Sequence, residues 1–270
     1  MVLIFSQIYR GHRMKIFSGG SKSIKDIVAL PNRRILDEAI YSEAEFLVGD
    51  CPGADAAIQK YLAGCEYDNV TVYASGHKVR NNIGGWKVRF VEYDPSLVRY
   101  DFYRQKDIQM ELDCDCAVMA WDGKSKGTRQ NIIDLMSLGK HIYNMLWQRK
   151  TDEWYKLNGG IDAEFLLEKN CFDRKVKLWL DDVQPAPHEY VRCRSVAEAK
   201  LYIQTAERNG IDIEIIDCDD ELSLYSRLGG DGINLLDWLA ERGTFYPLSL
   251  HTVNPFGYRD MQKMIERYWK

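Results

Sequence analysis

Short apolar runs recur along the chain and alternate with longer stretches of helical spacing. In the first half these runs lie at 15–17, 44–48, 70–73, 116–120 and 141–145. Strands that alternate with helices form a mostly parallel sheet with helices on both faces. The first half therefore predicts an α/β fold with a doubly wound sheet.

The alternation starts again after residue 174 on a smaller scale. The pattern predicts strands at Lys175–Leu180 and Tyr190–Cys193 and before Ile216 and His251, and helices from Ser195, Gly232 and Tyr258. We predict a larger domain at 14–146, a linker at 147–174 and a smaller α/β domain at 175–270. With 46% hydrophobic residues among 270, each domain has enough apolar side chains for its own core.

Charge and cysteine content narrow the class of protein. The net charge is -4 and Lys and Arg are dispersed, which argues against polymeric nucleic acid as a partner. Seven cysteines at irregular positions are typical of reduced thiols in the cytoplasm. No apolar run is long enough to span a membrane, and Met1–Phe5 is too short for a signal-peptide core. Met14 opens the first predicted strand, so residues 1–13 are either native or an extension from an upstream start.

In the second half, three predicted strands stop at acidic or histidine side chains. Asp181 and Asp182 follow the first strand, a run from Asp217 to Asp220 ends the second, and His251 ends the third. The carboxyl ends of parallel strands lie at one edge of a sheet, so these side chains are expected to converge on one crevice. Carboxylates can hold Mg²⁺ or Mn²⁺, and a histidine beside them can protonate a leaving oxygen. We therefore predict a divalent-metal site that acts on phosphate.

Specific roles follow for the residues of this crevice. The predicted metal ligands are Asp181, Asp182, Asp217 and Asp219, and the predicted catalytic residues are His251, Asp182 and Asp219. In the alternative, Asp182 and Asp231 cap helices or turns, and His251 is a buried histidine with satisfied hydrogen bonds. We favour the metal site because suitable groups recur at three strand ends.

Several neighbouring residues have two open interpretations. Strand alternation places Asp217 and Asp219 on one side of the sheet and Asp220 on the other, unless the chain has already left the strand there. Arg192 and Arg194 either hold a substrate phosphate or are surface charges. Both Trp179 and Trp238 are expected in the core.

Turns rich in glycine and serine follow three strands of the first half, at Ser18–Ser21, Gly49–Asp55 and Gly127–Thr128. Glycines let backbone N–H groups approach a phosphate, and a helix N-terminus attracts an anion. Each turn alone is equally typical of an ordinary strand-to-helix connection, with Asp55 as a cap in the second. Three at one sheet edge favour a nucleotide pocket formed by Ser18, Gly19, Gly20, Ser21, Gly49, Asp50, Gly53, Asp55, Gly127 and Thr128.

Two further stretches add cationic and amide side chains. Arg80 and Asn82 lie in the loop after the third strand and suit phosphate or ribose, although a solvated loop is the alternative. Arg104 lies in a predicted helix and is expected to face the same pocket. Its neighbours Tyr103 and Ile108 are expected on the core face of that helix.

The turns of the first half resemble those of the SLOG superfamily, a Rossmann-like group that includes the lysine-decarboxylase-like phosphoribohydrolases and the YspA-type proteins. The resemblance covers roughly residues 14–146 and rests on Ser18-Gly19-Gly20, Val48 to Asp55 and Gly127-Thr128. It implies a Rossmann-like fold, a nucleotide or NAD-derived ligand, and a homodimer.

The enzymatic branch of that superfamily has a proline-glycine-glycine run before its Gly-Thr pair and a glutamate three residues after the threonine. This chain has Asp122 to Lys126 and Asn131 at those positions. An amide cannot replace that carboxylate in glycosidic cleavage. The first half is therefore predicted to bind a nucleotide without cleaving its N-glycosidic bond.

The second half resembles receiver domains, in which an acidic pair at a strand end holds magnesium. A plain receiver ends its last core strand in a lysine, whereas this chain has His251 to Pro255 there. The match that remains, over about residues 175–270, is to the cyclic-phosphate-processing receiver-like domain. It rests on Leu180-Asp181-Asp182, Asp217 to Glu221, Gly229-Gly230-Asp231 and His251 to Gly257. It implies processing of cyclic or terminal phosphates.

These expectations combine into one functional hypothesis. The protein binds a nucleotide-derived signalling molecule, of the cyclic-phosphate or NAD/ADP-ribose type, and processes it with Mg²⁺ or Mn²⁺, as would suit phage defence or counter-defence. Such an enzyme would be a metal-dependent phosphodiesterase or phosphohydrolase. The alternative is a non-catalytic nucleotide sensor or sponge whose receiver-like half is a regulatory or dimerisation module. A phosphoaccepting receiver is a third possibility, which the missing lysine disfavours.

Overall fold

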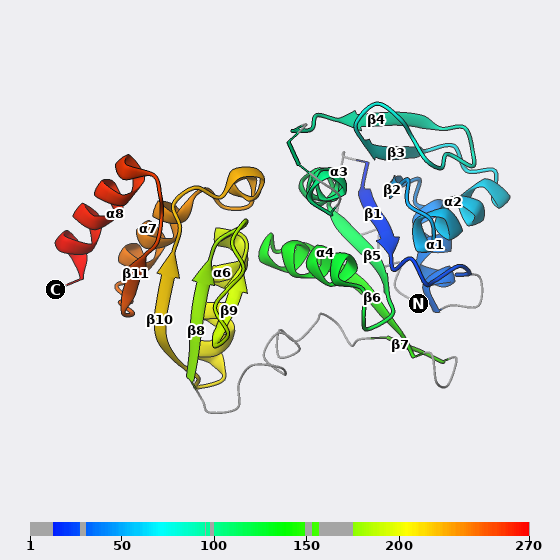
Figure 1. The fold of residues 1–270 in the computed structure, drawn as a ribbon. Coiled ribbons are helices and arrows are strands. Elements are labelled where there is room, and N and C mark those ends of the chain that lie inside the picture. Colours follow the sequence, from blue (N-terminus) through cyan, green and yellow to red (C-terminus); the bar gives the residue numbers. More distant parts are fainter. Residues whose placement is uncertain are drawn as a thin grey trace. The chain divides into compact units, whose positions relative to one another are not determined.

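The computed structural model describes residues 13–27, 31–94, 96–97, 100–148, 153–156 and 175–269. The chain forms two compact units, Met1–Ile161 and Asp162–Lys270, each with a sheet of its own (Figure 1). Both sheets consist mainly of parallel strands joined by helices, which confirms the predicted α/β class. Most of the segment predicted as a linker lies outside the described residues.

The first unit has a seven-stranded sheet in the order β4-β3-β2-β1-β5-β6-β7. Six strands are parallel, and β7 pairs antiparallel with the end of β6. The strands are β1 (Lys15–Gly20), β2 (Glu45–Gly49), β3 (Val70–Ser75), β4 (Lys87–Val91), β5 (Cys116–Trp121), β6 (His141–Gln148) and β7 (Glu153–Lys156).

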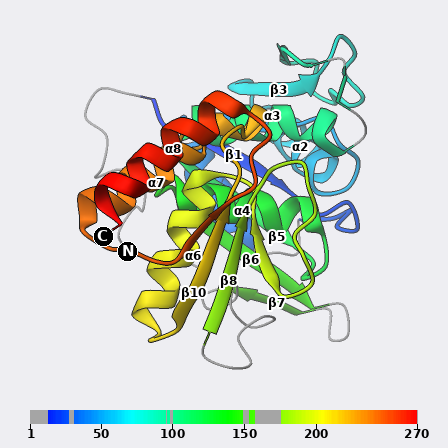
Figure 2. The ribbon, with the colours of Figure 1, turned by 60° about the vertical axis from the view of Figure 1, so that its left-hand side comes forward.

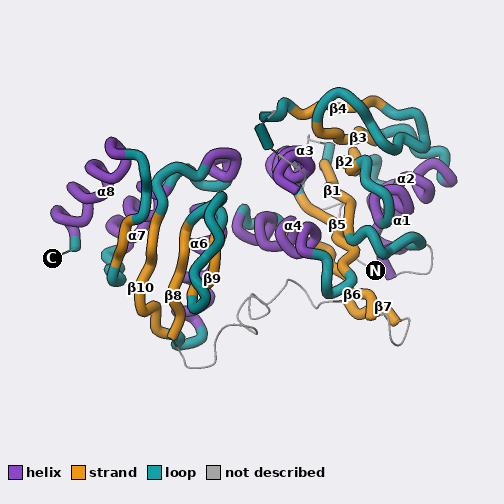
Figure 3. Tube along the Cα trace, in the orientation of Figure 1, coloured by secondary structure: helices purple, strands orange, loops and turns teal. Residues whose placement is uncertain are grey.

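Helices cover both faces of this sheet (Figure 3). They are α1 (Pro31–Tyr41) and α2 (Ala54–Gly64) on one face and α3 (Tyr100–Asp113) and α4 (Lys126–Ser137) on the other. Successive strand residues point to opposite faces, and both Ile16 and its neighbour Phe17 are buried. The central strands are therefore apolar without alternation, as expected for a sheet covered twice.

The sequence pattern did not predict β4. Three of its five side chains, Lys87, Arg89 and Phe90, are exposed. A strand at the edge of a sheet has little apolar surface to bury, and charged side chains there discourage pairing with other chains. An edge strand of this kind leaves no apolar run in the sequence.

The order of strands identifies a crevice in the first unit. From β1 the chain adds β2, β3 and β4 on one side and then returns to add β5 and β6 on the other. The loops after β1 and β5 therefore run apart and leave space at the carboxyl ends of the two strands.

The second unit has four parallel strands in the order β11-β10-β8-β9. They are β8 (Lys175–Leu180), β9 (Tyr190–Cys193), β10 (Asp212–Cys218) and β11 (Leu248–Leu250). From β8 the chain adds β9 on one side and then β10 and β11 on the other, so the reversal lies between β8 and β10. A second crevice is therefore expected at the carboxyl ends of these two strands.

The helices of the second unit pack in sequence on one another. They are α6 (Val196–Arg208), α7 (Gly232–Arg242) and α8 (Pro255–Tyr268), and a 3-10 helix, η1 (Ser223–Arg227), precedes α7. α6 contacts the sheet, α7 contacts α6, and α8 lies beside α7 (Figure 2). On one face of the strands the side chains are buried, whereas the alternate residues of β8 and β9 are less deeply buried.

Candidate functional site

The polar residues of the second unit are held at the carboxyl edge of its sheet by the backbone. The N–H of Asp181 donates to Cys193, that of Asp219 to Leu180, and that of His251 to Cys218, at 2.9–3.1 Å. These bonds extend the strand pairing by one residue beyond each strand, so the three side chains are fixed relative to one another.

Strand register places the polar side chains in two rows across the sheet. Ser249, Asp217, Trp179 and Arg192 are Cα partners on four successive strands. Because side chains alternate along a strand, the residues two positions further on extend this face towards the edge. Those residues are His251, Asp219, Asp181 and Arg194.

His251 lies at the centre of these contacts. Its Nδ1 is 2.7 Å from Oδ1 of Asp217, and its Nε2 is 3.2 Å from Oδ2 of Asp181. Its ring stacks on Trp179 with centroids 3.7 Å apart and planes inclined by 6°. Carboxylates only accept hydrogen bonds, so the imidazole can donate to both only when both its nitrogens carry protons. Each ring nitrogen of His251 therefore faces a carboxylate oxygen.

Asp181 has a structural and a site-facing oxygen. Its Oδ1 accepts the backbone N–H groups of Val183 and Gln184 at 2.7 and 2.5 Å, which fixes the loop after β8. Its other oxygen faces His251. One candidate ligand atom each from Asp181, Asp219 and His251 lies within 4.8 Å of the other two, a spacing that a single cation can bridge.

Two carboxylate oxygens at this edge are buried without a hydrogen-bond partner among the described residues. They are Oδ1 of Asp182 and Oδ1 of Asp219. Burial, followed by the charge of Asp181, raises the pKa of Asp182 to about 6. Buried carboxylate oxygens are normally satisfied, and a divalent cation satisfies them well. The residues present therefore fit an Mg²⁺ or Mn²⁺ ion.

The structure separates the remaining predicted residues by role. Asp217 lies on the far side of the His251 ring from Asp181 and is outside the group that could share one cation. Asp182 is also outside that group. Asp220 accepts the N–H of Ile233 at 3.3 Å, at the start of α7, so its carboxylate belongs to the helix and not to the His251 contacts.

In this unit the capping alternative is supported at one residue, and the expected place of two tryptophans needs correction. Asp231 forms a capping box with Asn234 at the start of α7, so the capping alternative holds for this residue. The tryptophans expected in the core are only half-buried. Trp179 lies under His251, and Trp238 contacts the guanidinium of Arg242 instead. Aromatic residues with such polar neighbours are not distinguished from core residues by apolar periodicity.

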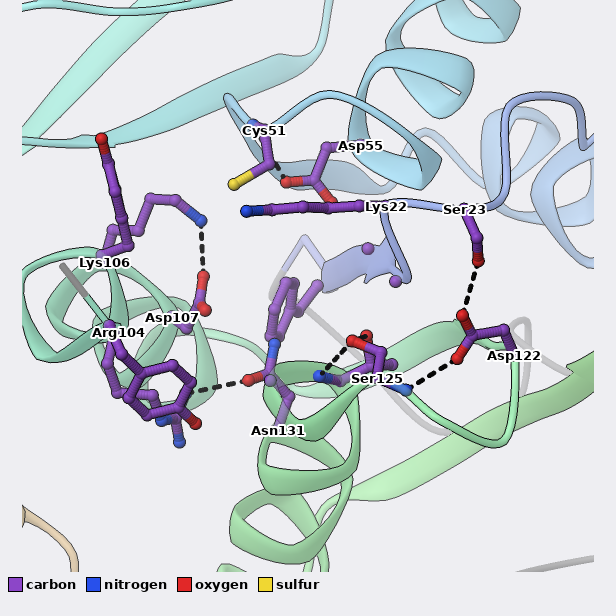
Figure 4. Close-up of a pocket in the computed structure, with 17 residues that line it drawn as sticks. Lys22, Ser23, Cys51, Asp55, Arg104, Lys106, Asp107, Asp122, Ser125 and Asn131 are labelled. Carbon is purple, nitrogen blue, oxygen red and sulfur yellow. Dashed lines mark hydrogen bonds and ion pairs between the residues drawn. The ribbon is translucent and has the colours of Figure 1, made fainter.

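The first unit has a pocket of about 490 Å³ at the carboxyl ends of β1 and β5 (Figure 4). Of the predicted ligand residues, Gly19, Gly20, Asp55, Arg104, Gly127 and Thr128 line it. The others do not: Ser18, Ser21, Gly49, Asp50, Gly53, Arg80 and Asn82. The pocket lies where the chain reversal predicts it, but the turns contribute fewer of its residues than the sequence suggested.

Several glycines of these turns have close protein neighbours. A Cβ on Gly49 would lie 2.2 Å from Oδ2 of Asp55, and one on Gly20 would lie 2.1 Å from the carbonyl oxygen of Ala120. Gly53 has φ +91°, and its Cβ would meet the backbone of Lys22. A sequence cannot distinguish a glycine that admits a ligand from one that admits another part of the same chain.

Several predicted ligand residues outside the pocket have partners within the protein. Arg80 forms an ion pair with Asp50, and Asn82 donates to the carbonyl of Trp86. Ser21 donates to Asp122 at 3.1 Å. These contacts stabilise the loops that surround the pocket.

Arg104 lines the pocket but is buried in a network of ion pairs and hydrogen bonds. Its guanidinium pairs with Glu111 at 2.8 Å, forms an ion pair with Asp134, and donates to Asn131 at 3.0 Å. Burial raises the pKa of Glu111 to about 7 despite the opposing effect of Arg104. The positive charge of Arg104 is therefore largely compensated within the protein.

The predicted ligand set did not include other residues that line the pocket. Lys22, Ser23, Cys51, Tyr100, Tyr103, Lys106, Asp107, Asp122, Ser125 and Asn131 all do so. Tyr103 is 38% exposed and stacks on Arg80, so its expected place in the core was wrong. Lys106 is buried, and the charge of Asp107 helps to raise its pKa against the opposing effect of burial. The packing of α3 across the sheet brings these side chains in, and no local signal shows it.

Burial also changes the pKa of Asp55, an acidic residue that lines this pocket. It raises the pKa of Asp55 to about 6, although Lys106 opposes the shift. Asp55 accepts the N–H of Cys51 at 3.2 Å and makes no side-chain cap on α2, whose N-cap is Gly53. The expected capping role of Asp55 is therefore replaced by a contact within the loop.

Comparison with known proteins bears on the second unit. The family model described as the cyclic-phosphate processing receiver domain matches residues 176–267. The match confirms the resemblance inferred for the second half and includes Asp181, Asp219 and His251. The resemblance of the first half to the SLOG superfamily stays a prediction. Neither the curated proteins nor the solved structures gave a match. Among the described residues, no helix has the length and apolar character needed to cross a membrane.

Proposed function

We propose that this protein binds a nucleotide-derived signalling molecule in its first unit and processes a phosphate bond in its second, with Mg²⁺ or Mn²⁺. The observation that carries this proposal is the contact of His251 with both Asp217 and Asp181, beside Asp219. A receiver-type sheet with this edge combines a proton donor with carboxylates suited to a cation.

Asp181 and Asp219 are the residues that would hold the metal ion, with Asp182 close enough to contribute charge. When bound, the ion would polarise a phosphoryl oxygen and activate water. The buried Oδ1 of Asp219, which has no hydrogen-bond partner among the described residues, supports this assignment, since a cation would satisfy it.

His251 is assigned the role of general acid. Asp217 holds its Nδ1, and the stacked ring of Trp179 fixes its plane. Its Nε2 therefore points towards Asp181 and can deliver a proton to an oxygen that leaves phosphorus nearby. Asp217 thus acts as a positioning residue, comparable to a carboxylate that orients a catalytic histidine.

The pocket of the first unit suits a nucleotide. Tyr100 and Tyr103 offer aromatic surface for a base, and Lys22 and Ser125 offer groups for phosphate or ribose. Asn131 lines the pocket and accepts a hydrogen bond from Arg104. An amide cannot act as a general base, so we propose that this unit retains the N-glycosidic bond.

The proposal is tested with the full chain and a panel of cyclic nucleotides, cyclic oligonucleotides, NAD and ADP-ribose variants, read by mass spectrometry. Turnover is expected only with Mg²⁺ or Mn²⁺ and is expected to fall at least about a hundredfold in Asp219→Asn. Asp212→Asn, on an exposed residue at the start of the same strand, is the matched control. Equal turnover with EDTA present, or in Asp219→Asn, would contradict the metal site.

A non-catalytic sensor or sponge is the second candidate. The observation that favours it is the pocket itself, in which Arg104 and Asn131 are engaged with each other and no carboxylate stands at the position of Asn131. Recovery of intact ligand from the purified protein, with no metal-dependent conversion, would select this function. A homodimer and a cytoplasmic location stay predictions, and light scattering would measure the first.

A further inference from the structure

The second unit also has buried hydrogen-bond donors without a partner among the described residues. They are Nη2 of Arg192 and Nε1 of Trp179. Both residues lie in the same row of the sheet and are Cα partners on β8 and β9. A buried donor that makes no hydrogen bond is costly, and such groups need an explanation.

These two donors lie beside the proposed metal site. Nε of Arg192 donates to the carbonyl oxygen of Asp181 at 2.9 Å, and the ring of Trp179 stacks on His251. Each donor therefore belongs to a side chain in contact with Asp181 or with its partner His251. In the described part of the second unit, all four buried polar atoms without partners surround this edge: two acceptors, on Asp182 and Asp219, and two donors.

The two acceptors and the two donors differ in charge, so they would bind different ligands. The acceptors are carboxylates and call for a cation. The donors include a guanidinium next to a second one, Arg194, and they call for an anion. A guanidinium is the preferred group for phosphate because its planar fork presents two N–H groups at once. A metal ion at Asp219 and a phosphate group at the two donors would together satisfy three of these four atoms.

We propose that Arg192 and the indole N–H of Trp179 form an anion subsite that holds the phosphate group of the substrate next to Asp181 and His251. This inference rests on the proposed function, and it names the residues that recognise the group on which the site acts. The subsite is built from donors alone, so it binds phosphate without a metal ion. Nη2 of Arg192 and Nε1 of Trp179 are both buried, so binding is accompanied by reorientation of both side chains, which are otherwise half-buried.

The test measures binding of inorganic phosphate to the full chain in EDTA, by calorimetry and by the indole N–H signals of ¹⁵N-labelled protein. Trp179→Phe keeps an aromatic ring against His251 and removes the N–H, so the signal that it abolishes is that of Trp179. In the unsubstituted chain this signal is expected to shift as phosphate is added. Trp179→Phe is expected to weaken phosphate binding about threefold or more.

Arg192→Ala is expected to weaken phosphate binding at least about tenfold, because a charge-assisted hydrogen bond is lost. Arg192→Lys keeps the charge but not the fork and is expected to give an intermediate loss. Arg208→Ala, at an exposed position in the last turn of α6, makes the same change in net charge and is expected to have no effect. Circular dichroism checks that the variants are folded.

The outcomes separate this inference from the proposed function. Phosphate binding that persists in Arg192→Ala and in Arg192→Lys places the anion elsewhere and overturns the subsite, as does a Trp179 signal that phosphate does not move. Since the measurement contains neither metal nor turnover, phosphate binding at Arg192 can hold even if the panel shows no conversion. Conversely, turnover with unchanged phosphate binding in Arg192→Ala would leave the metal site intact and refute the subsite alone.

Discussion

Arg104 provides a stringent prediction because two buried carboxylates depend on it. Arg104→Met removes the cation that pairs with Glu111 and Asp134, and each of these three side chains is at most 1% exposed. Removing one partner of a buried ion pair costs about 3–5 kcal/mol, since the charge left behind has no compensation. In a domain of this size, each kcal/mol of lost stability lowers the melting temperature by about 2–4 °C, so the melting temperature is expected to fall by roughly 6–20 °C.

The two units require an assay that reports on each separately. Cys114 and Cys116 are buried in the first unit, and Cys193 and Cys218 in the second. Pulsed thiol labelling in urea, read by mass spectrometry, therefore measures the unfolding free energy of each unit in the same sample. Arg104→Met is expected to lower the unfolding free energy reported by the two cysteines of the first unit and to leave that reported by the two cysteines of the second unit unchanged.

The pH dependence follows from the same contacts. Burial already raises the pKa of Glu111 to about 7, and Arg104 opposes this rise. Without Arg104 the folded-state pKa rises further above the unfolded value. A raised carboxyl pKa stabilises the protonated native state, so that stability is present at low pH and is lost as pH rises through the folded pKa. The unfolding free energy of the first unit of Arg104→Met should therefore be lower at pH 8 than at pH 6.

The control for this prediction is another arginine of an ion pair. Arg33→Met removes an exposed pair with Asp37, whose two side chains are 56% and 50% exposed, and should cost less than about 0.5 kcal/mol. The reasoning is refuted if Arg104→Met leaves the protection of Cys114 and Cys116 within that range. In that case Arg104 is not needed for stability and is available to a ligand in the pocket.

Three other predictions concern single contacts. Asp55, with its pKa raised by burial to about 6, should make the first unit about 2 kcal/mol less stable at pH 6 than at pH 4, since one pKa unit corresponds to about 1.4 kcal/mol and part of the shift lies outside this pH range. Thiol labelling of Asp55→Asn should show a flatter pH profile, and exposed Asp68→Asn should not. Gly49→Ala would place a Cβ 2.2 Å from the Asp55 carboxylate and should lower the unfolding free energy measured in urea by about 1–3 kcal/mol. Its control, Gly64→Ala, has open space around it and should be neutral or slightly stabilising. Asp231→Ala removes the capping box of α7 and should cost about 0.5–2 kcal/mol in the second unit; an unchanged urea midpoint would show that the cap is dispensable.

The sequence predicted which polar side chains of the second unit come together because strand ends are local features. Apolar runs stop at Asp181, Asp217 and His251, and parallel pairing alone then brings their side chains to one edge. Alternation also separated Asp219 from Asp220 correctly: Asp219 joins the residues around His251, and Asp220 binds the start of α7.

Features that depend on distant packing could not be predicted in this way. Arg104 and Glu111 lie on one helix, but Asp134 comes from another, so the charge balance of Arg104 is set by how α3 and α4 pack. Lys106 reaches the pocket for the same reason. Gly49 was interpreted as room for a phosphate, whereas its close neighbour is the carboxylate of Asp55.

The position of the reactive groups just beyond the strands has a consequence for how such a protein can change. Asp181 and His251 each follow the last residue of a strand, and their backbone bonds would survive replacement of either side chain. Substitution there alters reactivity while the ladder and the apolar face of the sheet remain. Under the proposed function, the second unit can therefore lose its catalysis through a few point mutations and still fold, so relatives that retain this architecture while lacking His251 would be expected to persist as binding proteins.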